Sequence, residues 1–235
     1  MSHADIWAII QTSPMPKPST IAIDGPAACG KTTVGKLLAK KLGYRFVDTG
    51  AMYRALTWEA LRLGVGIEDE DALRRLAEST RMEMPSGGGD GIMVNGRYIN
   101  SELRSPEVDF GVSPVAKVAG VRKVLVRNQR AMAKDGRIVM VGRDIGTNVL
   151  IDADLKIYLD VSVEEQARRR HKEMAEQGEQ AEYKDILESL VRRDRIDSRR
   201  SINPLSKADD AHVINTDLYD AKGVLKEILK LMDEH

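Results

Sequence analysis

The chain has 235 residues, of which 42% are apolar and 31% charged, and its 36 basic residues balance 36 acidic ones. This length suits one α/β domain with an insertion, and the balanced charge gives no general attraction to nucleic-acid polymers or anionic membranes. The single cysteine, Cys29, excludes an internal disulfide and a cysteine zinc site and fits the reducing cytoplasm, and no apolar run is long enough to span a membrane.

Residues 1–19 differ in character from the rest of the chain. They contain Pro14, Pro16 and Pro18, and prolines at this spacing favour irregular chain. We therefore expect an N-terminal extension over residues 1–19, flexible in solution, and one folded domain over residues 20–235.

The first expected strand leads directly into a glycine-bounded loop. The apolar run Ile21–Ile23 is followed by a Gly-x-x-x-x-Gly-Lys-Thr motif and then by a helical pattern, which is the context of a P-loop. In such a loop backbone N–H groups surround phosphate oxygens, Lys31 reaches the β- and γ-phosphates, and the Thr32 hydroxyl binds Mg²⁺. The sequence predicts a nucleoside-triphosphate site formed by Gly25, Pro26, Ala27, Ala28, Cys29, Gly30, Lys31, Thr32 and Thr33.

Beyond the loop, helical periodicity alternates with short apolar runs. The expected strands lie at 44–47, 137–141, 155–159 and 211–214. Strands that alternate with helices predict an α/β fold with a mostly parallel sheet and helices on both faces.

The alternation is interrupted between residues 82 and 112. Asn95-Gly96 stands between two apolar runs there, which predicts a β-hairpin with a type I′ turn and so a small antiparallel insertion. Residues 113–134 then return to a single helical pattern.

Polar residues follow two of the expected strands, where ligands bind in open α/β sheets. Asp48-Thr49-Gly50 precedes Arg54, and Arg143 directly follows an apolar strand. The planar guanidinium of arginine can hold two phosphate oxygens. A solvated helix surface explains Arg54 equally well, whereas Arg143 is harder to explain in that way.

A second arginine-rich region covers residues 165–200. Arg168–Arg170 lie on one expected helix, and the next helix, 182–200, carries Arg193, Asp197 and Arg200 on one face. Two such helices joined by a turn near Gly178 predict a helical lid that closes over polyphosphate and expels water.

Two features argue against a GTPase switch. The chain has no Asn-Lys-x-Asp base-recognition motif, and its one Asp-x-x-Gly motif, Asp220–Gly223, belongs to the last expected helix.

Several motifs together resemble the bacterial-type cytidylate kinase family, a group of P-loop nucleoside monophosphate kinases, from about Thr20 to the C-terminus. They are Asp24-Gly-Pro, Asp48-Thr-Gly-Ala-Met-Tyr-Arg54, Ser113-Pro-Val-Ala116, Val121-Arg-Lys, Arg127-Asn-Gln-Arg130, Gly142-Arg-Asp-Ile-Gly-Thr147 and Asn203-Pro-Leu. The resemblance implies ATP- and Mg²⁺-dependent phosphorylation of CMP and dCMP in pyrimidine nucleotide metabolism, by a cytoplasmic monomer. It also implies that the 82–112 insertion helps to bind the monophosphate. One departure is Ala28, where the family often has glycine.

The resemblance also assigns residues. It implies substrate contacts for Thr49, Arg54, Ser113, Arg122, Arg143, Asp144, Arg193, Asp197 and Arg200. The P-loop motif and the placement of the arginines lead us to expect catalytic roles for Lys31, Arg143 and Arg193. The Ser113 position precedes the long expected helix.

Some alternatives stay open at this stage. Asp144 could hold Mg²⁺ through water, or it could accept a hydrogen bond from the exocyclic amine of cytosine. The chain could also be another P-loop small-molecule kinase, or a nucleotide-dependent binding module without catalysis.

Overall fold

The computed structural model describes residues 17–85, 89–176, 178 and 180–234. Most of the expected extension, residues 1–16, therefore lies outside the described residues. At its end, the Ser19 backbone N–H donates to the Asp154 carboxylate at 2.9 Å, one residue before the first strand.

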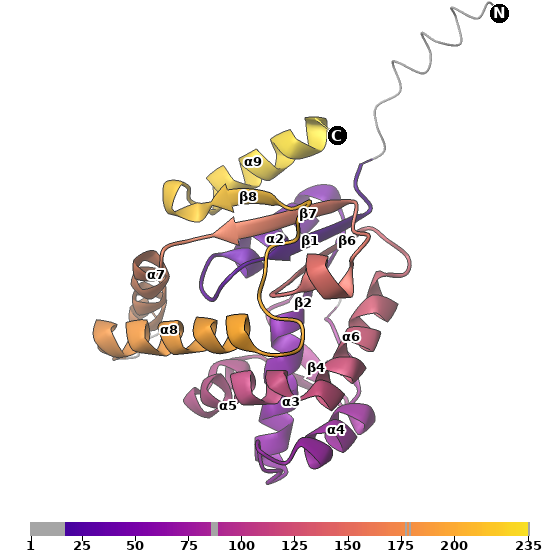
Figure 1. Cartoon of the computed structure of the whole chain (residues 1–235), viewed down its shortest axis with the longest axis vertical. Coiled ribbons are helices and arrows are strands. Elements are labelled where there is room, and N and C mark those ends of the chain that lie inside the picture. Colours follow the sequence, from indigo (N-terminus) through magenta and orange to yellow (C-terminus); the bar gives the residue numbers. More distant parts are fainter. Residues whose placement is uncertain (1–16, 86–88, 177, 179, 235) are drawn as a thin grey trace, which may run out of the picture.

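A parallel sheet of five strands forms the centre of the described chain (Figure 1). Its order is β2-β6-β1-β7-β8. The bounds are β1 Thr20–Asp24, β2 Arg45–Asp48, β6 Ile138–Gly142, β7 Leu155–Asp160 and β8 His212–Asn215. The α/β fold with a parallel sheet, predicted from the alternating pattern, is confirmed.

Helices cover both faces of this sheet because the central strands are apolar on both sides. Alternate residues of β1 point to opposite faces, so Ala22 joins one buried cluster while Ile21 and Ile23 join the other. The first cluster packs against α3 (Thr49–Arg62), α4 (Glu70–Ser79), α5 (Pro106–Lys117) and α6 (Ala119–Ala133). The second packs against α2 (Lys31–Leu42) and α9 (Ala221–Glu234).

The expected insertion contains a small antiparallel sheet. Its strands are β3 (Met82–Glu83), β4 (Ile92–Val94) and β5 (Arg97–Ile99). Asn95 and Gly96 have φ angles of 49° and 82°, as a type I′ turn requires, so the hairpin prediction is confirmed. A short 3₁₀ turn, η1 (Ser101–Arg104), follows.

The prediction of a single helix over residues 113–134 is wrong. The chain forms α5 and α6 with an extended residue, Val118, between them, and Ser113 lies inside α5 rather than before a long helix. The start of α5 has an ordinary signal, because the Ser105 side chain caps the helix and Pro106 occupies its first turn. The apolar pattern runs through Val118, and so it hides the break.

Glu59 on α3 attaches the insertion hairpin to the main domain. Its buried carboxylate accepts hydrogen bonds from Arg62 Nε at 2.7 Å and from Asn95 Nδ2, in the hairpin turn, at 3.1 Å. The Arg62 contact is the main cause that lowers the pKa of this carboxyl. Sequence reasoning missed Glu59 because its partner in the turn is 36 residues away.

Replacement of Glu59 by alanine should lower the free energy of unfolding by about 1–3 kcal/mol, because the Asn95 amide and the Arg62 guanidinium lose their acceptor. Chemical denaturation measures this difference. Glu78→Ala is the matched control, since Glu78 is half exposed and pairs with Arg74 on the surface of α4; its effect should stay within about 0.5 kcal/mol. Equal effects of the two substitutions would contradict the anchoring role.

The arginine-rich region forms two helices, α7 (Val163–Glu176) and α8 (Tyr183–Arg199), which pack together and lie next to α5 (Figure 1). Ser162, directly before α7, forms half of a capping box. Ser162 Oγ accepts from the Glu165 N–H at 3.3 Å, but the Ser162 N–H donates to Asp217 instead. Residues 177 and 179 lie outside the described residues, and lid closure stays a prediction.

Among the helices of the described ranges, none combines the length and the apolar character needed to cross a membrane.

Candidate active site

A cavity of about 370 Å³ opens at the carboxyl ends of the parallel strands, between the P-loop, α3, α5 and the two helices of the predicted lid, α7 and α8. Seven of the nine predicted P-loop residues, Ala27 to Thr33, line it, while the Gly25 and Pro26 carbonyls accept hydrogen bonds from Lys31. All nine residues predicted to contact the substrate also line this cavity: Thr49, Arg54, Ser113, Arg122, Arg143, Asp144, Arg193, Asp197 and Arg200.

The P-loop backbone needs its glycines. At Gly25, which has a φ of 153°, a Cβ atom would lie only 2.3 Å from the Leu159 carbonyl oxygen. Gly30 caps α2 in a left-handed conformation with a φ of 93°. Ala28 is also left-handed, with a φ of 50°, a conformation that costs an L-residue about 1–2 kcal/mol. Glycine would adopt it without that cost.

Lys31 is buried against the loop that it is expected to serve. Its Nζ donates to the Gly25 carbonyl at 2.8 Å and the Pro26 carbonyl at 2.5 Å, and it lies 3.3 Å from Cys29 Sγ. Burial lowers the pKa of this ammonium. The Ala27 N–H donates to Asp194, on α8, at 3.1 Å. The ammonium and a loop amide therefore have protein partners that phosphate oxygens would replace.

Thr32 lies beside a carboxylate that sequence reasoning did not assign to the site. Its hydroxyl donates to Asp48 Oδ2 at 2.9 Å, and the same carboxylate caps α3 at Ala51 and lies 3.8 Å from Arg54 Nη2. The available signal was its place at the end of a strand, directly before Thr49. The described residues contain no group of three or more His, Cys, Asp or Glu side chains that could hold a metal by themselves.

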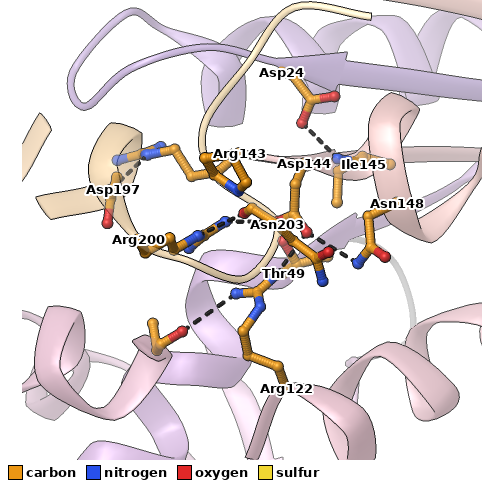
Figure 2. Close-up of polar contacts among 12 residues, drawn as sticks. Asp24, Thr49, Arg122, Arg143, Asp144, Ile145, Asn148, Asp197, Arg200 and Asn203 are labelled. Atoms are coloured by element: carbon orange, nitrogen blue, oxygen red, sulfur yellow. Dashed lines mark hydrogen bonds and ion pairs between the residues drawn. The ribbon is translucent and has the colours of Figure 1, made fainter. Parts of the chain in front are cut away.

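Asp144, which also lines the cavity, is bound by two arginines (Figure 2). Its Oδ2 accepts from Arg122 Nη2 at 2.5 Å and from Asn148 Nδ2 at 3.0 Å, and its Oδ1 accepts from Arg200 Nη2 at 3.2 Å. Arg122 is only 2% exposed, and its guanidinium lies over the ring of Tyr53. A carboxylate that already neutralises two guanidinium groups is a poor partner for a metal ion, which disfavours the metal role left open for Asp144.

A π-helical turn, η2 (Ile145–Val149), holds Asp144 in place from the following residues. Asp24, at the end of β1, accepts from the Ile145 and Gly146 N–H groups at 2.8 Å each. Arg130 donates to the Asn148 carbonyl at 2.6 Å. Burial raises the pKa of Asp24 to about 6, although the hydrogen bonds from the Gly146 and Ile145 N–H groups act in the opposite direction. The turn and the hydrogen bonds that Asp24 and Arg130 make to it were not expected, because these contacts join residues far apart in the sequence.

Arg143 connects the lid to the P-loop. Its Nε donates to Asp197, on α8, at 3.0 Å, and its Nη1 donates to the Gly25 carbonyl at 3.2 Å (Figure 2 shows the Asp197 contact). Beside it, the Thr49 hydroxyl donates to the Val141 carbonyl at 2.9 Å. The guanidinium is therefore fixed at the point where the P-loop, β6 and α8 meet.

The arginines of the predicted lid do not all line the cavity. Arg169, Arg170 and Arg193 line the cavity, but Arg168 does not: it is exposed and pairs with Glu165. Consecutive helical residues point about 100° apart, so the expectation that Arg168–Arg170 together face the phosphates is wrong for Arg168. Burial, followed by the neighbouring Arg143 and Arg54 charges, lowers the pKa of Arg193 to about 10.

Comparison with known proteins gives consistent results. A family model described as cytidylate kinase matches residues 21–234. A cytidylate kinase from Geobacillus thermodenitrificans (strain NG80-2) is 49% identical over 215 residues, 91% of this chain and 96% of that protein. One from Geobacillus sp. (strain WCH70) is 47% identical with the same coverage. The crystal structure of an uncharacterised protein from Eubacterium ventriosum covers 92% of this chain and 98% of its own, with a TM-score of 0.51 and 14% identity, which shows likeness of fold alone.

Proposed function

The chain belongs to the cytidylate kinase family, and from this premise we propose that its cavity transfers the γ-phosphoryl group of ATP to CMP or dCMP. One observation supports the site assignment above the others. The buried Asp144, with its two arginines, lines the same cavity as the P-loop, so a candidate base-reading group and a phosphate-binding loop share one space.

In this proposal the donor phosphates bind the loop amides and Lys31, which exchanges its contacts with the loop carbonyls for contacts with phosphate oxygens. The acceptor phosphate binds Arg54, Arg143 and Arg200. Arg193, from the lid, offsets the charge on the transferred group. The acceptor oxygen is already anionic, so the reaction needs no general base.

The cytosine ring is read by Ser113, Arg122 and Asp144. A carboxylate offers only acceptors, which suits the N4 amine of cytosine and repels the O4 of uracil. Asp144 keeps acceptor capacity for this contact, because its Oδ1 accepts one hydrogen bond, from Arg200, and an ionised oxygen can take more. Thr49 and Asp197 complete the walls around the acceptor.

The residues present fit a magnesium ion. A hydroxyl beside a carboxylate at the end of the P-loop offers the oxygen ligands that Mg²⁺ prefers, so Thr32 and Asp48 would hold the ion together with phosphate oxygens. When bound, Mg²⁺ supplies positive charge to the phosphate oxygens and so favours transfer.

Replacement of Asp48 by asparagine should raise the Mg²⁺ concentration needed for half-maximal activity by about tenfold, because the site loses its anionic ligand. Asparagine caps helices well, so α3 keeps its start. Asp69→Asn is the matched control, since Asp69 caps α4 in the same way outside the cavity. An unchanged Mg²⁺ requirement in Asp48→Asn would remove Asp48 from metal binding.

We also propose that the chain acts as a cytoplasmic monomer. The residues proposed to bind the donor and the acceptor all come from this chain, and the lone cysteine suits a reducing compartment. Within the domain of residues 20–235, the insertion over 82–112 contributes to monophosphate binding, and Arg104, which follows its hairpin, lines the cavity. Residues 165–200 form the lid.

A coupled assay of ADP release across CMP, dCMP, UMP, AMP and shikimate tests the proposed function. The highest kcat/KM values should belong to CMP and dCMP. A preference for shikimate would favour another small-molecule kinase. ADP release that does not depend on any acceptor would favour a nucleotide-dependent binding module.

A further inference from the structure

Two acidic residues in the cavity have no part in the proposed phosphoryl transfer. Among the described residues, those that line the cavity include nine basic and five acidic side chains. Asp48 is proposed to hold the metal, Asp144 to read the base, and Asp197 pairs with Arg143, but Asp109 and Glu173 have no assigned role in the reaction. A carboxylate in a space built for polyphosphate repels the ligand, so its presence needs a physical reason.

Both acids bridge the acceptor side and the lid. Arg170 Nη2, on α7, donates to Asp109 Oδ2, on α5, at 3.1 Å, and Arg193 Nη1, on α8, lies 3.8 Å from Asp109 Oδ1. Arg170 Nη1 donates to Glu173 Oε2 at 3.1 Å, and Glu173 also forms an ion pair with Arg104, in η1. Two carboxylates therefore hold three cavity-lining arginines that come from three elements.

These arginines need a counter-charge before nucleotide binds. The Arg193 side chain is 23% exposed, and its buried Nε has no hydrogen-bond partner among the described residues. Burial and the neighbouring Arg143 and Arg54 charges act on it unfavourably, whereas the Asp197 and Asp109 charges act in its favour. A buried charge without a partner is strongly unfavourable, so the two carboxylates stabilise an arginine cluster that would otherwise repel itself.

The donors of Arg170 show what nucleotide binding must change. Both of its terminal nitrogens donate to carboxylates, one to Glu173 and one to Asp109. A guanidinium that grips phosphate with two parallel hydrogen bonds must release at least one of these.

We propose that Asp109 and Glu173 are positioning residues: they hold Arg104, Arg170 and Arg193 at the cavity until the phosphates of the substrates replace them. This inference rests on the proposed function, since it concerns the same polyphosphate ligands. The two carboxylates thus lower the affinity for polyphosphate while keeping the arginines oriented. If the two carboxylates served only to hold the lid helices against α5, their loss would weaken polyphosphate binding instead.

The test uses Asp109→Asn and Glu173→Gln in the full chain. Each amide keeps an oxygen that can accept from arginine and removes only the charge. Calorimetric titration with inorganic tripolyphosphate and with ADP should show Kd falling by roughly three- to tenfold in each variant, the range expected when a partly buried charge pair is exchanged. Asp71→Asn is the control, because Asp71 is an exposed acid on α4 outside the cavity and loses the same charge; its Kd should stay unchanged.

Steady-state kinetics separates positioning from packing. KM for ATP should fall in Asp109→Asn while kcat does not rise, whereas loss of a merely structural contact would raise KM and lower the melting temperature. An unchanged or higher Kd for tripolyphosphate in both variants would overturn the proposal. If Asp109→Asn does not fold, Glu173→Gln decides, since Glu173 is more than a third exposed. Tripolyphosphate binding does not require CMP phosphorylation, so a wild-type chain inactive toward CMP would contradict the proposed function without deciding this inference.

Discussion

Replacement of Lys31 by methionine should lower kcat by about a hundredfold to a thousandfold, the loss expected when a charged donor that stabilises the transition state is removed. Lys31 is the cation at the centre of the P-loop, and it already holds the loop through the Gly25 and Pro26 carbonyls. Its contacts with phosphate strengthen as charge moves between the β- and γ-phosphates, so the loss should appear in kcat more than in KM.

The control for this experiment is Lys40→Met, which removes an exposed lysine from the last turn of the same helix. Its rate should match the wild type. Methionine has nearly the shape of the lysine stem, and so Lys31→Met should keep the fold, which circular dichroism can check. A variant that retains more than about a tenth of the wild-type kcat would remove Lys31 from its role.

Replacement of Asp144 by serine should change base selectivity. We expect kcat/KM for CMP to fall by the equivalent of about 2 kcal/mol or more, while kcat/KM for UMP changes little or improves, because the acceptor that faces O4 of uracil is gone. The measurement compares CMP with UMP at saturating Mg-ATP. Equal losses for both bases, relieved by excess Mg²⁺, would instead support metal binding by Asp144.

The same substitution should destabilise the fold. Without Asp144, the buried Arg122 and the nearby Arg200 lose their shared counter-ion. Removing one partner of a buried ion pair costs about 3–5 kcal/mol. Asp152→Ser, at an exposed loop position, is the stability control and should have little effect. If Asp144→Ser loses no more stability than this control, the buried pair is not a stabilising element.

Much of the fold and site could be predicted from local sequence patterns. The P-loop was predictable because its strand, glycines, Lys31 and helix are consecutive. Arg143 and Asp144 were predictable as a site because polar residues that follow buried strands meet at one edge of a parallel sheet. The hairpin at Asn95-Gly96 was predictable because few residue pairs tolerate two positive φ angles in succession.

The features that the sequence did not reveal depend on contacts across long separations. Asp24 holds the turn after Asp144 from 121 residues away, and Asp109 meets Arg170 across 61 residues. No periodicity carries that information. The break at Val118 was hidden because an apolar residue fits both one helix and the junction of two. Arg168 was misplaced because a run of arginines was treated as one surface, although a helix turns its members to different sides.

The contact between Asp144 and the cytosine base is tested most directly by a crystal structure of the wild-type chain with CMP and ADP bound. We predict that the exocyclic amine of cytosine donates to the Asp144 carboxylate at a distance of about 3 Å, with Arg122 still paired to the same carboxylate. The CMP phosphate should then lie among Arg54, Arg143 and Arg200, on the side of the P-loop. A cytosine ring that binds away from Asp144, or an Asp144 carboxylate that turns toward a metal ion, would contradict this assignment.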